Sequence, residues 1–281
     1  MEREHMENDD PRSCANCAVR ACDDRSAEGA ARAYPSFCLT QRTPDEEFED
    51  AAALYRNDPE TARIFQAAAE VEGLFYSQLT RVEEVMVFAR RIGARKIGIA
   101  TCMGLIDEAQ AFARILRAKG FEDVCAVACK VGAVAKERAG IADDVKVHPG
   151  CFEPTCNPIM QARILNEAGC DLNVIVGLCV GHDTLFMKHA EAPVTYLVVK
   201  DRVLAHNPAA ALYTKGSYYK RLLSPDLPEP RPRAGKEGGT PTPGDAAQAA
   251  LGTSENASTI AMSRESSFLG SSAPPEPERA D

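Results

Sequence analysis

The chain of 281 residues has an apolar content of 45%, which is enough for a substantial buried core. Its formal net charge of −9 comes mostly from the two ends, while the central part is near neutral and has no basic stripe, so nucleic acid is not expected as a partner. No apolar run approaches the ~20 residues of a membrane-spanning helix, and the acidic first residues are unlike a secretory signal.

The eleven cysteines indicate the chemistry of the protein. Their odd number means that they cannot all pair within one chain. Because the sequence shows neither a secretory signal nor a membrane span, we expect a cytoplasmic protein that does not associate with membranes, and thiols stay reduced in that compartment. In such a protein, cysteines act as metal ligands, as reactive thiols or as packing residues.

Four cysteines near the start have the spacing of metal ligands. Cys14, Cys17 and Cys22 form a C-x2-C-x4-C pattern, and fifteen residues separate Cys22 from Cys38. Four thiolates can complete a tetrahedron around zinc or ligate an iron–sulfur cluster. Residues 12–44 have no hydrophobic pattern of their own, so we predict a segment organised by metal. The spacing matches neither common ferredoxin pattern, which slightly favours zinc at this first site.

The next residues, 45–94, have the pattern of helices. Asp58-Pro59 is typical of a helix start, and Thr80 with Glu83 forms a capping-box sequence. Residues 1–11 and 224–281 have the opposite character. They are polar, and the second segment is rich in proline and glycine, so we expect both to be disordered.

From residue 95 the pattern alternates between strands and helices. We expect strands at residues 96–102, 123–129, 171–179 and 194–200, with helices between them, the last one capped by Asp183. This alternation predicts an α/β domain over residues 95–223, with three layers and a mainly parallel sheet covered by helices on both faces. The cysteine-rich segment and short helices precede it.

A second group of cysteines lies at the predicted strand ends. Cys102, Cys129 and Cys179 each end a strand, and Cys156 directly precedes the Asn157-Pro158 helix start. Ligands of open α/β sheets bind beyond the carboxyl ends of the strands, so these four could form a second thiolate-rich metal site. Packing is the alternative for each of them, because free cysteine is often buried as a small apolar residue.

The remaining polar residues give weaker indications. His182 and Asp183 lie close to Cys179 along the chain, and a cysteine–histidine pair can activate a nucleophile. The candidate catalytic residues are therefore Cys179, Cys102, His182 and Asp183. Lys200-Asp201-Arg202 is expected to form a tight hairpin turn without a chemical role. No glycine-rich phosphate-binding motif is present, so nucleotide binding has no support.

Several segments resemble a known family, the domain-of-unknown-function family eighteen-forty-seven. They are CANCAVRAC, IGIATCMGL, ACKVG, CNPIMQARILN and GLCVGHDTLFMKHAEAPVTYLVVKDRVLAHNP, and they span about residues 12–213. The family is cysteine-rich and has been suggested to bind metal, and no activity is established for it. The resemblance implies a metal at the N-terminal cysteines and places Lys130 and the candidate residues of the α/β domain in characteristic motifs.

Three hypotheses about function remain open. The first is a metal-binding protein, with zinc or an iron–sulfur cluster as cofactor and with redox or metal-dependent chemistry. The second is an enzyme with a cysteine nucleophile, Cys179 or Cys102, and His182 as base. The third is a metal-handling or binding protein in which zinc is structural. A small molecule or a redox partner fits the first two, and the sequence leaves the oligomeric state open.

Overall fold

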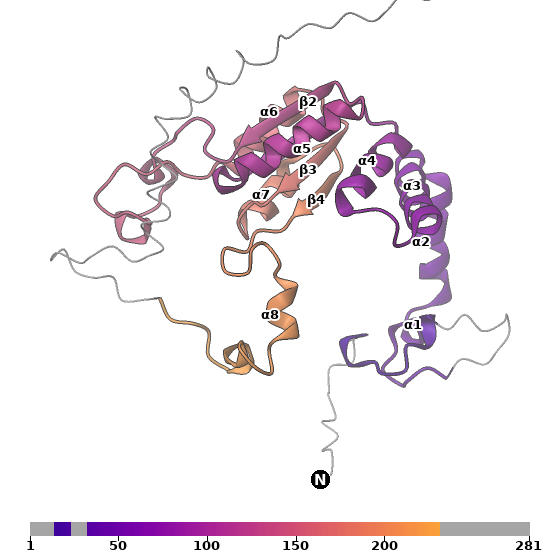
Figure 1. The fold of residues 1–281 in the computed structure, drawn as a ribbon. Helices are drawn as coiled ribbons and strands as arrows, with labels where there is room; N and C mark the ends of the chain where they lie inside the picture. Colours follow the sequence, from indigo (N-terminus) through magenta and orange to yellow (C-terminus); the bar gives the residue numbers. More distant parts are fainter. Residues whose placement is uncertain (1–13, 24–32, 231–281) are drawn as a thin grey trace, which may run out of the picture. The chain divides into compact units, whose positions relative to one another are not determined.

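The computed structural model describes residues 14–23 and 33–230 (Figure 1). The predicted disorder of residues 1–11 and of most of the tail therefore lies outside the described residues. The chain divides into two units, Met1–Leu222 and Leu223–Asp281, and all elements discussed below belong to the first. In the described parts, no helix is long and apolar enough to cross a membrane.

Helices precede the sheet, as the capping signals predict. Asp58 accepts a hydrogen bond from the Thr61 amide at 2.8 Å, with Pro59 in the first turn. Thr80 and Glu83 form the reciprocal capping box that the sequence predicts. The elements of this part are two 3₁₀ turns at Cys14–Asn16 and Ala21–Asp23, then α1 (Leu39–Arg42), α2 (Asp45–Asn57), α3 (Pro59–Phe75) and α4 (Arg81–Arg91).

The α/β domain contains a four-stranded parallel sheet with the strand order β2-β1-β3-β4 (Figure 1). Its strands are β1 (Lys96–Thr101), β2 (Asp123–Ala128), β3 (Leu172–Val176) and β4 (Val194–Val198). Its principal helices are α5 (Ile106–Ala118), α6 (Pro158–Glu167), α7 (His182–His189) and α8 (Ala209–Tyr213).

The connections place helices on both faces of the sheet. From β1 the chain moves to β2, on one side of β1 in the sheet. From β2 it crosses past β1 in a second, opposite direction to reach β3, on the other side. Because such crossovers are right-handed, α5 and α6 must cover opposite faces. The step from β3 to β4 continues in the second direction, so α7 shares the face of α6, against which it packs. The prediction of a three-layer α/β fold is confirmed.

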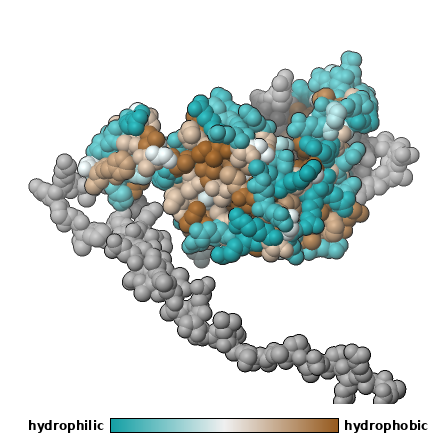
Figure 2. All heavy atoms as spheres, turned by 90° about the horizontal axis from the view of Figure 1, so that it is seen from above, coloured by the Kyte–Doolittle hydropathy of each residue, from teal (hydrophilic) through white to brown (hydrophobic). Residues whose placement is uncertain are grey.

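The core lies between these layers. The β3 strand is buried along its whole length, and Ile97, Ile99 and Val174 are completely inaccessible to solvent. Strands that are covered on both faces consist of nearly continuous apolar residues, which explains the runs in the sequence. On the face that Figure 2 shows, hydrophobic side chains gather in patches beside larger hydrophilic areas.

Two local expectations are wrong. Helix α7 begins at His182 after Gly181, whose φ of +83° suits glycine, so Asp183 does not cap this helix. Residues 200–202 do not connect two strands as a hairpin turn, because no strand follows β4 among the described residues. Instead, the Asp201 carboxylate accepts hydrogen bonds from the amides of Val203 and Leu204, both at 2.8 Å, and forms a compact loop.

Asp171 fastens the beginning of β1 to the beginning of β3. Its carboxylate accepts hydrogen bonds from the amides of Lys96 and Arg95, both at 2.8 Å. The Lys96 amide is the main reason why the pKa of Asp171 is lowered, and the Arg95 amide adds to this effect. The charged form is therefore the one that stabilises the fold.

We predict that Asp171→Ala lowers the free energy of unfolding by about 1 kcal/mol at neutral pH, because two charge-assisted bonds are lost at a largely exposed site. Because the pKa of Asp171 is lowered in the folded protein, its carboxylate stabilises the fold at pH values above the normal aspartate range. This contribution to the free energy of unfolding disappears as the pH falls through the lowered pKa. Urea unfolding at several pH values measures the difference. Glu122→Ala removes an exposed carboxylate near the same edge and is the control. An equal loss at neutral and strongly acidic pH would contradict the assignment.

Candidate functional site

The carboxyl edge of the sheet brings together the four cysteines of the second predicted group, here called the crevice cysteines: Cys102, Cys129, Cys156 and Cys179. Cys102 and Cys129 directly follow β1 and β2, and Cys179 follows β3. Cys156 precedes Asn157, whose side chain caps α6 and whose amide donates to the carbonyl of Cys129 at 2.7 Å. The strand order reverses between β1 and β3, which is where ligands of such sheets bind.

The crevice cysteines form a ring in which each thiol influences the ionisation of two others. Cys102 and Cys156 each interact with Cys129 and Cys179, and these interactions shift the pKa values of all four. The Sγ atoms of Cys156 and Cys129 are 3.8 Å apart. Cys102 and Cys129 are buried, whereas Cys156 and Cys179 are partly accessible from outside. Residues up to 77 positions apart in the chain therefore share one small site.

Gln161 of α6 holds two of the strand ends in place. Its side-chain amide donates to the carbonyl groups of Thr101 at 3.1 Å and of Val127 at 2.7 Å. Thr101 directly precedes Cys102, and Val127 lies two residues before Cys129. Gln161 itself is completely buried, so water does not compete for these bonds. The two thiols therefore lie on a fixed backbone.

Two cations from the loop after β4 contact the ring. The Lys200 ammonium lies 2.9 Å from the Cys102 sulfur, and the Arg202 guanidinium lies 2.9 Å from the Cys179 sulfur. No chemical role was expected for residues 200–202 from the sequence, so both cations are additions to the predicted site. Their position just after a strand end was the signal that could have identified them.

A hydrogen bond within this loop keeps the two cations in place. The Asp201 amide donates to the Nδ1 atom of His206 at 3.2 Å, and the His206 amide donates back to the Asp201 carbonyl at 2.9 Å. Asp201 lies between Lys200 and Arg202, so the reciprocal pair fixes the backbone from which both cations extend.

The four thiols differ in how readily they ionise. Interactions with the Cys129 and Cys179 thiols lower the pKa of Cys102, and Lys200 adds to this effect. Interactions with the same two thiols lower the pKa of Cys156 to about 2. Conversely, interactions with Cys102 and Cys156, together with desolvation, raise the pKa values of Cys129 and Cys179.

The two other catalytic candidates lie beside the ring. The Nδ1 atom of His182 is buried and has no hydrogen-bond partner among the described residues, and His182 makes a small contribution to the lowered pKa of Cys156. Asp183 instead accepts a hydrogen bond from the Tyr196 hydroxyl at 2.8 Å. Burial, and then this bond, raise the pKa of Tyr196 to about 12. Asp183 therefore joins α7 to β4.

Three cysteines of the α/β domain lie outside the ring. Cys125 lies within β2, and Cys170 is buried between α6 and β3, where desolvation and the nearby Cys125 raise its pKa to about 11. Cys151 is exposed in the long connection between β2 and α6. Cys125 and Cys170 thus occupy positions suited to packing.

The N-terminal cysteines form a separate group. Cys14, Cys17, Cys22 and Cys38 line one cavity of about 350 Å³. Burial acts against ionisation of Cys38, but hydrogen bonds from the Thr40 side chain and from the amides of Thr40 and Gln41 lower its pKa overall. Across the described residues, no group of three or more His, Cys, Asp or Glu side chains is already arranged to hold a metal ion.

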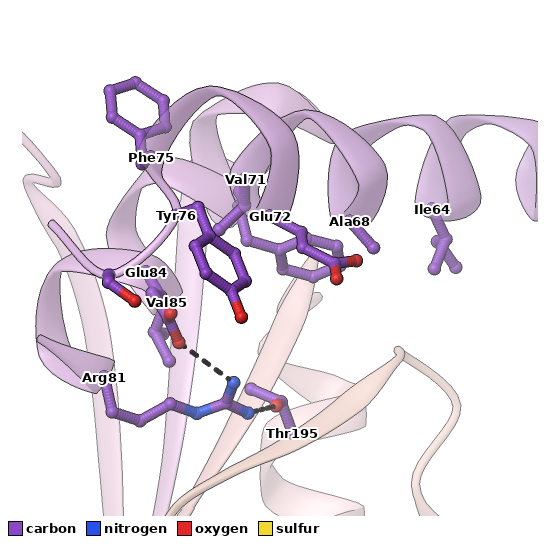
Figure 3. Close-up of a pocket in the computed structure, with 12 residues that line it drawn as sticks. Ile64, Ala68, Val71, Glu72, Phe75, Tyr76, Arg81, Glu84, Val85 and Thr195 are labelled. Atoms are coloured by element: carbon purple, nitrogen blue, oxygen red, sulfur yellow. Dashed lines mark hydrogen bonds and ion pairs between the residues drawn. The ribbon is translucent and has the colours of Figure 1, made fainter. Parts of the chain in front are cut away.

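Another cavity, of about 590 Å³, is lined by residues of α3, of α4 and of the turn between them, together with Thr195 near the beginning of β4 (Figure 3). Figure 3 shows the Arg81 guanidinium between Glu84 and Thr195. The same guanidinium also donates a hydrogen bond to the Tyr196 carbonyl. Arg81 therefore fastens α4 to β4. No thiol lines this cavity, so we place the candidate site at the cysteines.

The fold and the clustered thiols define a cysteine-rich α/β protein. The chain belongs to the family described as a protein of unknown function, DUF1847, which matches residues 38–197, more than half of the chain. The resemblance seen in the sequence is thus confirmed, although Cys14, Cys17 and Cys22 lie outside the matched residues. The chain is 49% identical over 164 residues to an uncharacterised protein of Methanocaldococcus jannaschii, covering 58% of this chain and 82% of that protein. No solved structure matches.

We predict that mild oxidation of the metal-free protein first joins neighbours in the ring, because only sulfurs already in contact can approach to bonding distance. The expected disulfides pair Cys102 or Cys156 with Cys129 or Cys179. Acid quenching, alkylation and peptide mass spectrometry identify the pairs, and Cys151→Ser removes the exposed thiol that could exchange with them. Early disulfides between Cys102 and Cys156, or between Cys129 and Cys179, would contradict the ring.

Proposed function

We propose that the four crevice cysteines bind a single metal ion, zinc or iron, in a metalloprotein of the cytoplasm. The convergence of four thiols at the carboxyl edge of the sheet is the observation that carries this proposal. Four sulfurs at about 2.3 Å from a central ion lie about 3.8 Å from one another. The separation of Cys129 and Cys156 is 3.8 Å. Thiolate ligands select zinc or iron over magnesium or calcium.

The charges around the ring also suit a metal. Four thiolates and a divalent ion carry a net charge of −2, and partial burial makes such a charge costly. Lys200 and Arg202, in contact with Cys102 and Cys179, supply two positive charges. Binding requires Cys129 and Cys179 to lose their protons and the four sulfurs to turn toward a common centre, so metal affinity should rise with pH.

A bound metal would have a defined role at this site. Four protein ligands leave no open position, so the ion would be structural, or redox-active if it is iron. Asn157 and Gln161, which fix the backbone beside Cys129 and Cys102, would limit movement of the ligands. Lys200 and Arg202 would tune the charge at the sulfurs, as outer partners of metal ligands do.

A cysteine nucleophile is the second candidate, in the form of Cys102. Lys200 contacts its sulfur and favours the thiolate, which is the reactive form. Cys102 is only 8% exposed, however, so a substrate would have to reach it past Cys179 or Cys156. The alternative pairing of Cys179 with His182 as base has less support, because the contacts of the Cys179 sulfur are with thiols and Arg202.

We predict that Cys129→Ser or Cys156→Ser weakens metal binding by the crevice roughly 100-fold or more, because three thiolates cannot complete the tetrahedron. Cys151→Ser, in the same connection as Cys156, should bind normally. The measurement is competition with a chromophoric chelator, together with elemental analysis of the full-length protein. Equal metal content and affinity in the Cys129, Cys156 and Cys151 variants would refute a crevice metal.

We also predict that Lys200→Gln lowers metal affinity about 10-fold, because the neutral side chain no longer balances the charge at Cys102. Lys188→Gln removes an exposed lysine of α7 and should have no effect. Both variants are compared in the chelator competition at low and high salt. Affinities that are the same for Lys200→Gln and the unchanged protein would show that this cation does not support the metal.

A further inference from the structure

The cavity of Figure 3 combines an apolar wall with a polar end. Small-molecule sites in proteins commonly have an apolar lining, a few convergent polar groups and a volume of roughly 300–1,000 Å³. This cavity has a volume of about 590 Å³, and its wall comes from α3 and α4. The apolar side chains of the wall are Ile64, Ala68, Val71, Val85 and Phe88. The lining therefore suits a small molecule with an apolar body.

The positive charge at the polar end is already engaged. The Arg81 guanidinium lies 3.5 Å from the Glu84 carboxylate, which offsets its charge. It also donates to the Thr195 hydroxyl at 2.9 Å and to the Tyr196 carbonyl at 3.2 Å. A ligand with a carboxylate would have to compete with Glu84 for this guanidinium. The cavity is therefore poorly suited to an anion.

The groups that lack a partner at this end are all oxygens. Glu72, Tyr76 and Ser77 line the cavity, and their side chains make no hydrogen bond or ion pair with another residue that the structure describes. Glu72 and Tyr76 are four positions apart, which places them on the same side of α3. Figure 3 shows the Glu72 carboxylate and the Tyr76 hydroxyl on the cavity side of this helix. All three residues are exposed, so water is their partner until a ligand displaces it.

The turn after α3 has a backbone conformation that is uncommon for its residue type. Ser77 has a φ of +57°, in the left-handed region that residues other than glycine seldom adopt. Such conformations persist where the surrounding structure holds them, and they cluster at functional sites. This turn ends α3 at Phe75 and brings Ser77 to the cavity. Its conformation thus serves the polar end of the cavity.

We propose that this cavity binds a small molecule with an apolar body and a primary ammonium group. An ammonium group of this kind carries one positive charge and three N–H donors. Glu72 supplies the opposite charge, and the hydroxyl groups of Tyr76 and Ser77 supply two further acceptors. The apolar body lies against the wall, and its removal from water drives binding. No thiol lines the cavity, so the site is independent of a metal in the crevice.

The first test compares hexylamine with hexanoate and 1-hexanol, which share its carbon chain and differ in the charge of the head group. Each probe is titrated into the full-length protein at neutral pH and followed by ligand-observed NMR. We expect hexylamine to bind about fivefold more tightly than the other two, because only the ammonium pairs with Glu72 at this partly solvated end. Tighter binding of hexanoate, similar binding of all three probes, or no binding of hexylamine would overturn the proposal.

Substitutions then locate the bound amine. Glu72→Gln removes the charge and keeps the size, so it should weaken hexylamine about fivefold and leave 1-hexanol unchanged. Glu60→Gln alters an exposed carboxylate in the first turn of the same helix and is the control. An unchanged affinity for hexylamine in Glu72→Gln would refute the pairing of the ammonium with this carboxylate.

A second pair of variants tests the apolar wall. Ala68→Phe fills the cavity from an exposed position and should abolish the binding of hexylamine. Ala69→Phe adds the same ring at an exposed position that does not line the cavity, so it should bind normally. Thermal unfolding shows whether both variants fold like the unchanged protein. The same affinity for hexylamine in these two variants would place the amine outside the cavity and overturn the proposal.

Discussion

A parallel sheet directs the carboxyl ends of all its strands to the same edge, and the thiol ring depends on this constraint. Each of β1, β2 and β3 is followed within three residues by a crevice cysteine, and the loop after β4 adds the two cations. Gln161 reinforces the arrangement by joining the ends of β1 and β2 from α6. The thiols meet because the fold of the backbone brings them together, although they are far apart in the sequence.

Such closeness has an electrostatic consequence. Thiols in contact cannot all ionise, since each additional thiolate repels those already present in a partly desolvated site. The direction of the pKa shift therefore alternates around the ring, lowered at Cys102 and Cys156 and raised at Cys129 and Cys179. Lys200 and Arg202 reduce the repulsion at two corners. Only a cation at the centre would allow all four to ionise.

The sequence predicted those parts of the molecule that depend on local patterns. The caps at Asp58 and Thr80 involve residues three positions apart, and apolar runs marked all four strands. The convergence of the crevice cysteines also followed, because strand direction determines it. Lys200 and Cys102 are 98 positions apart in the chain. The residue types at positions 200–202 alone therefore could not predict their contact. Asp183 was misassigned because Gly181, with its positive φ, precedes the first turn of α7.

The two groups of cysteines stand in opposite relations to folding. The crevice ring lies on a buried sheet with fixed strand ends, so the fold brings the four thiols close together, although their sulfurs are not yet arranged as metal ligands. The N-terminal segment has no fully buried described residue, and its four cysteines line one cavity. Metal binding there would have to supply the order that packing supplies in the crevice. Loss of a metal from the N-terminal cysteines should therefore unfold the segment that carries them, whereas loss of a crevice ion should leave the sheet intact.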